Sequence, residues 1–428
     1  MQAILKYIDA NLKTDISAGE LAAIAAYSPW HFYHVFSKEV GMPVAAYISK
    51  RRIDTALMEI AAGRKSASVA AEYGFDTYAG FYKAFVRMYG CSPRKYLALY
   101  GSYKPKQSGG MINMNEHEVR QLLTNWDVPQ NLPLGDIHII DRSAVSNNVW
   151  KLGNEYVLKC AARDMAFKNI RITKALAAQG FTAAQLVPTK TGEDYIDGEI
   201  ITTLTHRLPG MPLPKEDRFG ADRYNFGYKY GQAIAKLHIA LKEVEADIMP
   251  NESDAYKQCI DWALPNVQKQ NQQWNMGLAD DFFENYITEF GKLYEKMPRQ
   301  LIHRDANPSN ILFHNGEVSG FIDFELSQRN MRMVDVCYCA TGILCEWRGV
   351  DNIEEKWPLV LEGILKGYNS INPLTAEEKQ AAFYVLCSIQ MACVAYFANI
   401  EEFQELAKTN RGMLQYIAKC EELIKGMI

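Results

Sequence analysis

A short stretch in the last third of the chain, "LIHRDANPSNILF" at residues 301–313, sets polar side chains at fixed offsets among apolar ones. His303, Asp305 and Asn310 form an H-x-D-x4-N pattern, and Asp323 follows in a second apolar run, "GFIDFE". In phosphoryl transfer the protein itself carries out little covalent chemistry. It needs mainly a base, groups that hold metal ions, and reactants held in line. The spacing of these four residues therefore indicates transfer of a phosphoryl group to a hydroxyl.

Two longer stretches carry a resemblance: "YGQAIAKLHIAL" at 230–241, and "RQLIHRDANPSNILF" with the following "GFIDFE" at 299–325. They resemble the aminoglycoside phosphotransferase (choline-kinase-like) family of small-molecule kinases. The likeness extends more weakly from about residue 110 to residue 428. It implies an α+β, protein-kinase-like domain of two lobes that uses ATP and Mg²⁺.

The family's site residues carry over onto matching positions of this chain. The resemblance implies that Asp305 is the catalytic base, and that Asn310 and Asp323 bind the magnesium that accompanies the nucleotide. His303 would hold the catalytic loop, and Asp335 would brace that loop from further along the chain.

Lys159 is the expected partner of the nucleotide phosphates. It lies near the end of a predicted strand that follows a Gly153-Asn154 hairpin turn, where a lysine usually just extends to solvent. The resemblance gives it the phosphate role and makes 203–210 the segment that meets adenine. No glycine-rich loop precedes it, and Asp164 is the candidate carboxylate to orient it, since the next helix offers no glutamate.

The first hundred residues contain a duplication. Three residues recur 49 positions later, with Phe32, Phe36 and Gly41 returning as Phe81, Phe85 and Gly90. Each copy predicts a helix, a short turn and a second helix, and in the first copy Ser28 is the expected N-cap and Pro29 the first helical residue.

The second helix of each copy has an apolar face and an opposite face. The apolar faces are Phe32, Val35 and Phe36 in one copy and Phe81, Ala84 and Phe85 in the other. The opposite faces are Trp30, Tyr33, His34 and Ser37 in the first copy, and Ala79, Tyr82, Lys83 and Arg87 in the second. Such a surface fits either a plain helical bundle or a helix that enters the DNA major groove.

The second copy, "GFDTYAGFYKAFVRMYGCSP", resembles the signature of the AraC/XylS family of transcription regulators over about residues 1–100. The resemblance implies an all-α domain of two helix-turn-helix units joined by a long helix, here 44–63. On that helix Arg51 and Arg52 are expected either beside the DNA or packed by their stems. The expected DNA-facing side chains are Trp30, Tyr33, His34, Tyr78 and Lys83.

Charge is distributed unevenly between these parts. Residues 1–105 hold 13 Lys+Arg and 8 Asp+Glu, which leaves 33 and 42 of the totals of 46 and 50 for the remainder. A basic N-terminal part suits double-stranded DNA. Two recognition helices on one chain would enter successive major grooves ~34 Å apart, so a monomer is expected to suffice.

The chain is expected to be multidomain. The stretch "YGSYKPKQSGGMINMNEHEV" at 100–119 mixes Gly, Ser, Pro and Lys before a predicted helix, which is typical of a boundary. We therefore expect a DNA-binding domain at 1–105, a linker at 106–114 and a kinase-like domain at 115–428. Its small lobe would span about 115–208 and its large lobe about 209–428.

Cysteine usage and the N-terminus favour a cytoplasmic protein without a membrane partner. Nine cysteines are scattered without an even framework, and "MQAILKYIDANL" lacks the features of a signal peptide. Cys337 and Cys339 are expected to be buried thiols on a helix, and no structural metal is expected. The apolar run at 381–400 contains Ser388 and Gln390, and is expected to be a buried core helix.

Two functions stay open. The first is a transcription regulator fused to an ATP- and Mg²⁺-dependent phosphotransferase that acts on a small-molecule hydroxyl. The alternative is a regulator whose kinase-like domain is a non-catalytic sensor of an effector or nucleotide. Four acidic residues, Glu346, Asp351, Glu354 and Glu355, would form either a site for an amine-bearing acceptor or, as the favoured alternative, a solvated acidic surface.

Overall fold

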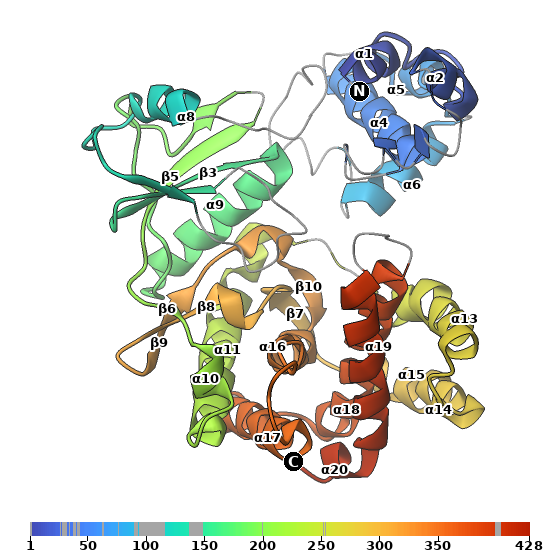
Figure 1. Cartoon of the computed structure of the whole chain (residues 1–428). Helices are drawn as coiled ribbons and strands as arrows, with labels where there is room; N and C mark the ends of the chain where they lie inside the picture. The colour runs from blue at the N-terminus through green and yellow to red at the C-terminus, as the bar shows by residue number, and fades with distance from the viewer. Residues whose placement is uncertain are drawn as a thin grey trace. The chain divides into compact units, whose positions relative to one another are not determined.

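The structure is a computed structural model of the 428-residue chain. It describes residues 2–25, 27, 32–33, 35–36, 40, 43–61, 64–75, 77–89, 93, 116–136, 149–198, 200–250, 252, 254–398 and 404–428. The chain, drawn in Figure 1, divides into two compact units. The first is Met1–His138, Val145–Phe167 and Val187–Leu204, and the second is Ile139–Ala144, Lys168–Leu186 and Thr205–Ile428.

The N-terminal part of the first unit is helical, as expected. Its helices are α1 (Gln2–Ala10), α2 (Ala18–Ile24), α4 (Val44–Ala61), α5 (Ser66–Glu72) and α6 (Tyr78–Tyr89). Ser17 caps α2 by accepting a hydrogen bond from the Glu20 backbone N–H at 3.1 Å. The predicted cap residues of the next helix, Ser28 and Pro29, lie outside the described residues.

The two predicted copies share one apolar core. Phe32 and Phe36 from the first copy and Phe81 and Phe85 from the second are all fully buried in it. Helix α4 contributes to the same core, so its side chains join the two copies. The predicted inward faces are therefore confirmed at these four aromatic positions.

The two arginines of α4 are packed against the protein. Arg51 Nε donates to Asp9 Oδ1 at 2.7 Å, and both side chains are largely buried. Arg52 donates to the backbone carbonyls of Leu12 at 3.0 Å and Thr14 at 2.6 Å. The sequence left open whether these arginines lie beside DNA or pack against the protein, and the structure shows them packed against it. Their hydrogen bonds connect α4 to α1 and to the loop that follows α1.

The rest of the first unit is built on a five-stranded sheet of order β1-β2-β3-β5-β4. Its elements are α8 (Glu116–Leu123), β1 (Leu134–Asp136), β2 (Val149–Leu152), β3 (Tyr156–Ala161), β4 (Ile196–Asp197) and β5 (Ile201–His206), with α9 (Arg163–Ala178) starting after β3. Strands β2 and β3 are antiparallel around a turn in which Gly153 has φ +55°, which confirms the predicted hairpin. Trp126 is buried in this core and its Nε1 donates to the Val187 carbonyl at 2.9 Å.

The second unit holds two small antiparallel sheets, β6-β8-β9 and β7-β10, among helices. The strands are β6 (Met211–Pro212), β7 (Arg299–Ile302), β8 (Ile311–His314), β9 (Glu317–Phe321) and β10 (Gln328–Met331). The longer helices are α11 (Arg223–Ile248), α13 (Leu264–Trp274), α16 (Met333–Leu344), α17 (Ile353–Ile371), α18 (Ala376–Phe397) and α19 (Gln404–Lys419). Shorter helical segments are α10 (Lys215–Arg218), α12 (Ala255–Gln258), η2 (Cys259–Ala263), α14 (Asp280–Asn285), η3 (Tyr286–Phe290), α15 (Gly291–Tyr294), η4 (Pro308–Asn310), η5 (Phe324–Leu326) and α20 (Glu421–Lys425).

Helix α18 is the one long apolar helix that the described residues contain. It has the length and hydropathy of a membrane span, yet 61% of its most apolar window is buried inside the protein. Thr375 and Glu378 form a capping box that begins it. It packs beside α19 and α16, as the orange and red helices of Figure 1 show. The predicted core helix is confirmed through Phe397, Ala398 is its C-cap, and residues 399–400 lie outside the described ranges.

Helices α11 and α17 approach each other through glycines. A Cβ at Gly231 would overlap the Ile364 carbonyl oxygen, and one at Gly367 would overlap the Tyr228 carbonyl. The contact is therefore backbone against backbone, and a side chain on either glycine would push the helices apart. This contact anchors α11, which carries His238, against the body of the unit.

Replacing Gly231 with alanine is expected to lower the free energy of unfolding by about 1–3 kcal/mol, because overpacking forces two helix backbones to shift. Calorimetry of both proteins measures the change. The matched control is Gly19→Ala in α2, where a Cβ meets nothing within 4 Å. That change is expected to stabilise by roughly 0.5–1 kcal/mol, since alanine favours helix over glycine. Unfolding of Gly231→Ala at the wild-type temperature would contradict the contact.

Candidate functional site

The sequence pattern at 303–310 forms a loop between strands β7 and β8. Strand β7 ends at Ile302, and the short helix η4 leads into β8. Asn307 caps η4, because its Oδ1 accepts from the Ser309 backbone N–H at 3.1 Å. The loop is thus held at both ends by strands of two different sheets.

Asp305 and Asn310 are brought together by this loop. The Asn310 side-chain amide donates to the Asp305 backbone carbonyl and to Asp305 Oδ2, each at 2.9 Å. The amide group therefore fixes both the main chain and the carboxylate of Asp305. Because Asn310 uses its N–H groups for this, its carbonyl oxygen is the atom left for a ligand.

The surroundings of Asp305 shift its pKa upward. Burial raises the pKa of Asp305, the charge of His303 lowers it, and the charge of Asp323 raises it again, with a net rise. A raised pKa makes the carboxylate a stronger proton acceptor when it is ionised. The charge of Asp323 therefore acts on Asp305, and the predicted role of Asp323 as a magnesium ligand stays a prediction.

Asp323 follows β9 in a left-handed backbone conformation, with φ +71°. The next residue is anchored by a hydrogen bond from the Phe324 backbone N–H to Asn169 Oδ1 at 3.2 Å. An aspartate in this conformation is several-fold more common than most other side chains. The turn directs the chain back toward β10 directly after the carboxylate.

Asp335 braces the loop from α16, and it is completely buried. Its Oδ2 accepts from the His303 backbone N–H at 2.7 Å, and its Oδ1 accepts from the Arg304 backbone N–H at 2.8 Å. The His238 imidazole also bonds Oδ2 at 2.9 Å. Burial alone would raise the pKa of Asp335, but the hydrogen bond and charge of His238 outweigh it and lower the pKa.

His303 lies inside the loop and is fully buried. Its Nε2 bonds the Ile322 carbonyl at 2.9 Å, and its Nδ1 accepts from the Asp305 backbone N–H at 3.3 Å. These bonds connect the segment that carries Asp305 to the segment that carries Asp323. The geometry thus makes His303 a positioning residue.

Lys159 belongs to the first unit. It lies on β3 opposite Val149 of β2, is half-buried, and its backbone carbonyl accepts from Thr203 Oγ1 at 3.4 Å. Asp164 lies in the first turn of α9. The phosphate role of Lys159, and its orientation by Asp164, stay predictions.

The four acidic residues near α17 do not act as one group. Glu346 pairs with Arg218, which is buried, so its charge is already compensated. Asp351 is exposed, and Glu354 and Glu355 are exposed in the first turn of α17. Asp351, Glu354 and Glu355 therefore form part of a solvated surface, which is the alternative that the sequence favoured.

Three residues around the loop were missed by sequence reasoning. They are His238, which pairs with Asp335, and Arg304 and Tyr338, which lie beside Asp305. His238 occurs within the stretch at 230–241. A histidine among apolar helix positions was the feature that could have marked it as a buried residue with a polar partner. Arg304 is part of the loop pattern itself, but nothing in its spacing distinguishes it.

The predicted DNA-facing residues are only partly described. Trp30 and His34 lie outside the described residues. Tyr33 and Lys83 are exposed, as expected, whereas Tyr78 is half-buried and stacks on Phe81 with ring centroids 5.7 Å apart. Exposure at Tyr33 and Lys83 is compatible with DNA contact, which stays a prediction.

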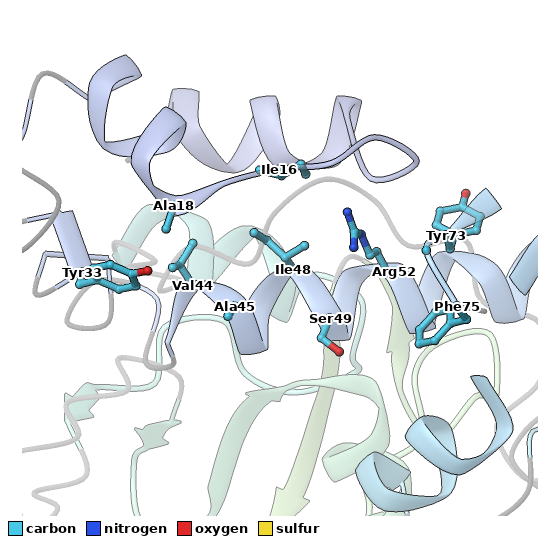
Figure 2. A pocket seen from close by; sticks show the side chains of 11 residues that line it. Ile16, Ala18, Tyr33, Val44, Ala45, Ile48, Ser49, Arg52, Tyr73 and Phe75 are labelled. Carbon is cyan, nitrogen blue, oxygen red and sulfur yellow. The ribbon is translucent and has the colours of Figure 1, made fainter. Parts of the chain in front are cut away.

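A hollow of about 390 Å³ runs along α4 between the two helix-turn-helix units. Figure 2 shows Val44, Ile48 and Ser49 of α4 along the hollow, with Tyr33 and Phe75 at opposite ends. Tyr33 therefore faces open space on the outside of the shared core.

No group of three or more His, Cys, Asp or Glu side chains that could hold a metal occurs in the part of the chain that is described. A magnesium site in a phosphotransferase needs no such group, because nucleotide phosphates and water supply most of the ligands. Cys337 and Cys339 are buried on α16, as expected for core thiols.

Comparisons with known proteins agree with both halves of this description. A helix-turn-helix domain family matches residues 21–98, and the phosphotransferase enzyme family matches residues 139–380. The chain is 37% identical over 94 residues to the HTH-type transcriptional activator AarP of Providencia stuartii, covering 22% of this chain and 70% of that protein.

Two further similarities concern the part of the chain that matches the phosphotransferase family. The chain is 29% identical over 189 residues to a homoserine kinase of Gluconobacter oxydans, covering 43% of this chain and 54% of the kinase, so it spans about half of that relative. An amicoumacin kinase solved in complex with AMP-PNP, Ca²⁺ and Ami superposes with a TM-score of 0.50 at 14% identity, over 72% of this chain and 94% of that one. The second likeness supports a common fold. The chain therefore belongs to the phosphotransferase enzyme family, and carries an AraC-type helix-turn-helix domain ahead of its phosphotransferase domain.

Proposed function

We propose that this protein binds double-stranded DNA through residues 1–105 and phosphorylates a hydroxyl group of a small molecule with ATP and Mg²⁺. The observation that carries the proposal is Asp305, a half-buried carboxylate of raised pKa whose main chain and side chain are both held by Asn310. A fixed carboxylate of this kind is what a hydroxyl acceptor needs as a base.

The residues present fit a divalent cation. The Asp305 and Asp323 carboxylates lie close enough to repel each other, and the Asn310 carbonyl oxygen is left over beside them. A cation next to Asn310 and Asp323 would relieve that repulsion, and oxygen atoms are the ligands that Mg²⁺ prefers. When bound, the metal supplies charge compensation for the phosphates.

The other predicted roles complete this proposal. Lys159 would meet the nucleotide phosphates, and His303 and Asp335 keep the loop in shape. On the DNA side Trp30, Tyr33, His34, Tyr78 and Lys83 are the proposed contacts, and one monomer would suffice. A cytoplasmic location follows from binding DNA and ATP.

The experiment is magnesium-dependent transfer of labelled phosphate from ATP to homoserine, amino alcohols, aminoglycosides and sugars. Transfer to at least one acceptor that stops with EDTA and returns with Mg²⁺ supports the proposal. Homoserine enters the panel because the similar relative is a homoserine kinase. If no acceptor is phosphorylated while nucleotide or a panel member still changes DNA affinity, the domain is a sensor and the enzyme proposal is wrong.

The acid limb of the pH profile is expected above the ordinary aspartate pKa of 3.8, because burial raises the pKa of Asp305. Only the ionised carboxylate accepts a proton, so activity is present above the raised pKa and lost as the pH falls through it. The measurement is kcat/KM for the acceptor against pH at saturating ATP. If activity falls with a midpoint at or below pH 3.8, the group that acts as the base is not in this environment.

A further inference from the structure

Asp323, the second carboxylate of the site, has a backbone conformation that few side chains adopt. Its φ is +71° and its ψ is +62°, in the left-handed region. This conformation is unfavourable for a residue that carries a Cβ, so the surrounding structure must hold it. The direction of the Asp323 side chain therefore depends on the contacts of the two peptide groups beside it.

The peptide group before Asp323 is held by the catalytic loop. The Ile322 carbonyl accepts from His303 Nε2 at 2.9 Å, and the Ile322 backbone N–H donates to the Asn310 carbonyl at 3.1 Å. Because a peptide group is planar, the direction of the Ile322 carbonyl is linked to φ of Asp323. The bond from His303 therefore restrains this angle from the segment that carries Asp305.

The peptide group after Asp323 is held by a different element. The Phe324 backbone N–H donates to Asn169 Oδ1 at 3.2 Å, and the direction of this N–H is linked to ψ of Asp323. Asn169 is a half-buried residue of α9, 155 positions away in the chain, and both residues belong to the second unit. Asn169 therefore restrains ψ of Asp323 as His303 restrains φ.

The bond from Phe324 to Asn169 has no simple substitute. The Phe324 side chain is 2% exposed, and its ring centroid lies 4.6 Å from that of His303. Packing of the ring fixes the position of Phe324 but leaves its peptide group free to turn. A sheltered N–H without an acceptor is unfavourable, so loss of the Asn169 oxygen would make this peptide group rotate toward another acceptor. Such a rotation changes ψ of Asp323 and moves its carboxylate.

Helix α9 thus contributes to the site in a way that its sequence did not reveal. The helix contains no glutamate that could orient Lys159. It supplies instead an asparagine whose carboxamide oxygen meets the residue directly after Asp323. We propose that Asn169 is a positioning residue for the metal site, which keeps the Asp323 carboxylate directed at the divalent cation that accompanies the nucleotide. The inference rests on the proposed function, which sets Mg²⁺ beside Asn310 and Asp323.

The experiment is calorimetric titration of the full chain with ADP, once in EDTA and once in excess Mg²⁺. The ratio of the two dissociation constants measures the coupling between metal and nucleotide. Asn169→Leu keeps a side chain of similar size and removes the acceptor. It is expected to lower this ratio about three- to ten-fold, which is the net contribution of one hydrogen bond. The dissociation constant for ADP in EDTA is expected to stay at the wild-type value, and Asn169→Ala is expected to give the same two results.

Two further variants make the test specific. Asn169→Asp keeps an acceptor oxygen in the same place, and is expected to give a ratio at or above the wild-type value, because its added charge also attracts the cation. Asn271→Leu removes a bond of the same kind elsewhere in the second unit, where Asn271 Oδ1 accepts from the Leu278 backbone N–H at 3.1 Å. It is expected to lower the melting temperature and leave the ratio unchanged. Thermal melting of each variant confirms that it is folded.

Several results would overturn the inference and leave the enzyme in place. One is a lower melting temperature in Asn169→Leu and Asn169→Ala with the wild-type ratio, because the bond would then serve stability alone. Another is a ratio in Asn169→Asp as low as in Asn169→Leu, since the acceptor oxygen would then not be the cause. A third is equally weakened ADP binding in EDTA and in Mg²⁺, which would assign Asn169 to the nucleotide.

Failure of the proposed function gives a different result, which is seen in the wild type. If the wild type binds no ADP, or binds it equally well with and without Mg²⁺, the proposed use of nucleotide and metal is wrong, and the inference about Asn169 fails with it. A wild type whose affinity for ADP rises with Mg²⁺ supports the cofactor assignment, and the variants then decide the role of Asn169.

Discussion

Replacing Asp305 with asparagine is expected to lower kcat for phosphate transfer by about 10²- to 10⁴-fold, the usual contribution of a positioned base. Asparagine has the same shape and can still accept the hydrogen bond from Asn310, so the loop keeps its geometry. It cannot take the proton of the acceptor hydroxyl. The measurement is single-turnover transfer at saturating ATP and acceptor.

The same variant is expected to melt at or above the wild-type temperature at neutral pH. Burial and Asp323 raise the pKa of Asp305, which means that the folded protein holds this charge at a cost. Asparagine removes the charge and that cost. Asp281→Asn, at an exposed aspartate of α14, is the matched control and should change neither kcat nor melting. Retained activity in Asp305→Asn would reject Asp305 as the base.

Replacing Asp335 with alanine is expected to destabilise the second unit by about 3–5 kcal/mol, as breaking a buried charged pair does. The carboxylate satisfies two backbone N–H groups and the imidazole of His238, and alanine leaves all three without their acceptor. Calorimetric melting of both proteins measures the loss. Transfer should fall as well, because the backbone of residues 303–304 is released.

His238→Ala separates the two parts of this effect. It removes the imidazole and leaves the backbone donors of the loop bonded to Asp335. It is expected to cost less stability and less activity than Asp335→Ala. If the two variants lost equal stability and equal activity, the effect of Asp335→Ala would come from its pair with His238 and not from its hydrogen bonds to the loop backbone.

The loop residues were predictable because their roles depend on short-range spacing. Five positions separate Asp305 from Asn310, and a turn of that length brings the amide onto the carboxylate. The inward aromatic faces of the N-terminal helices were predictable for a similar reason, since helical periodicity decides which side chains meet the core. The core position of α18 followed from two polar residues within its apolar run.

Pairings across long separations were not predictable from one sequence. His238 and Asp335 are 97 positions apart, and nothing local shows that α11 and α16 meet there. Glu346 looked like part of an acidic cluster until the fold placed buried Arg218 against it. The backbone angle of Arg304 is likewise set by Asp335, and an arginine in sequence carries no sign of it.

The shared core of the two helix-turn-helix units has a consequence for how the N-terminal part folds and fails. Phe32 and Phe36 belong to the same buried cluster as Phe81 and Phe85, and side chains of α4 belong to it as well, so the two units share part of their interior. Folding of this region is therefore cooperative: a cut in the segment between α4 and α5 would leave two fragments that each expose aromatic rings. We therefore expect heating, or a mutation in the shared core, to unfold both units in one transition.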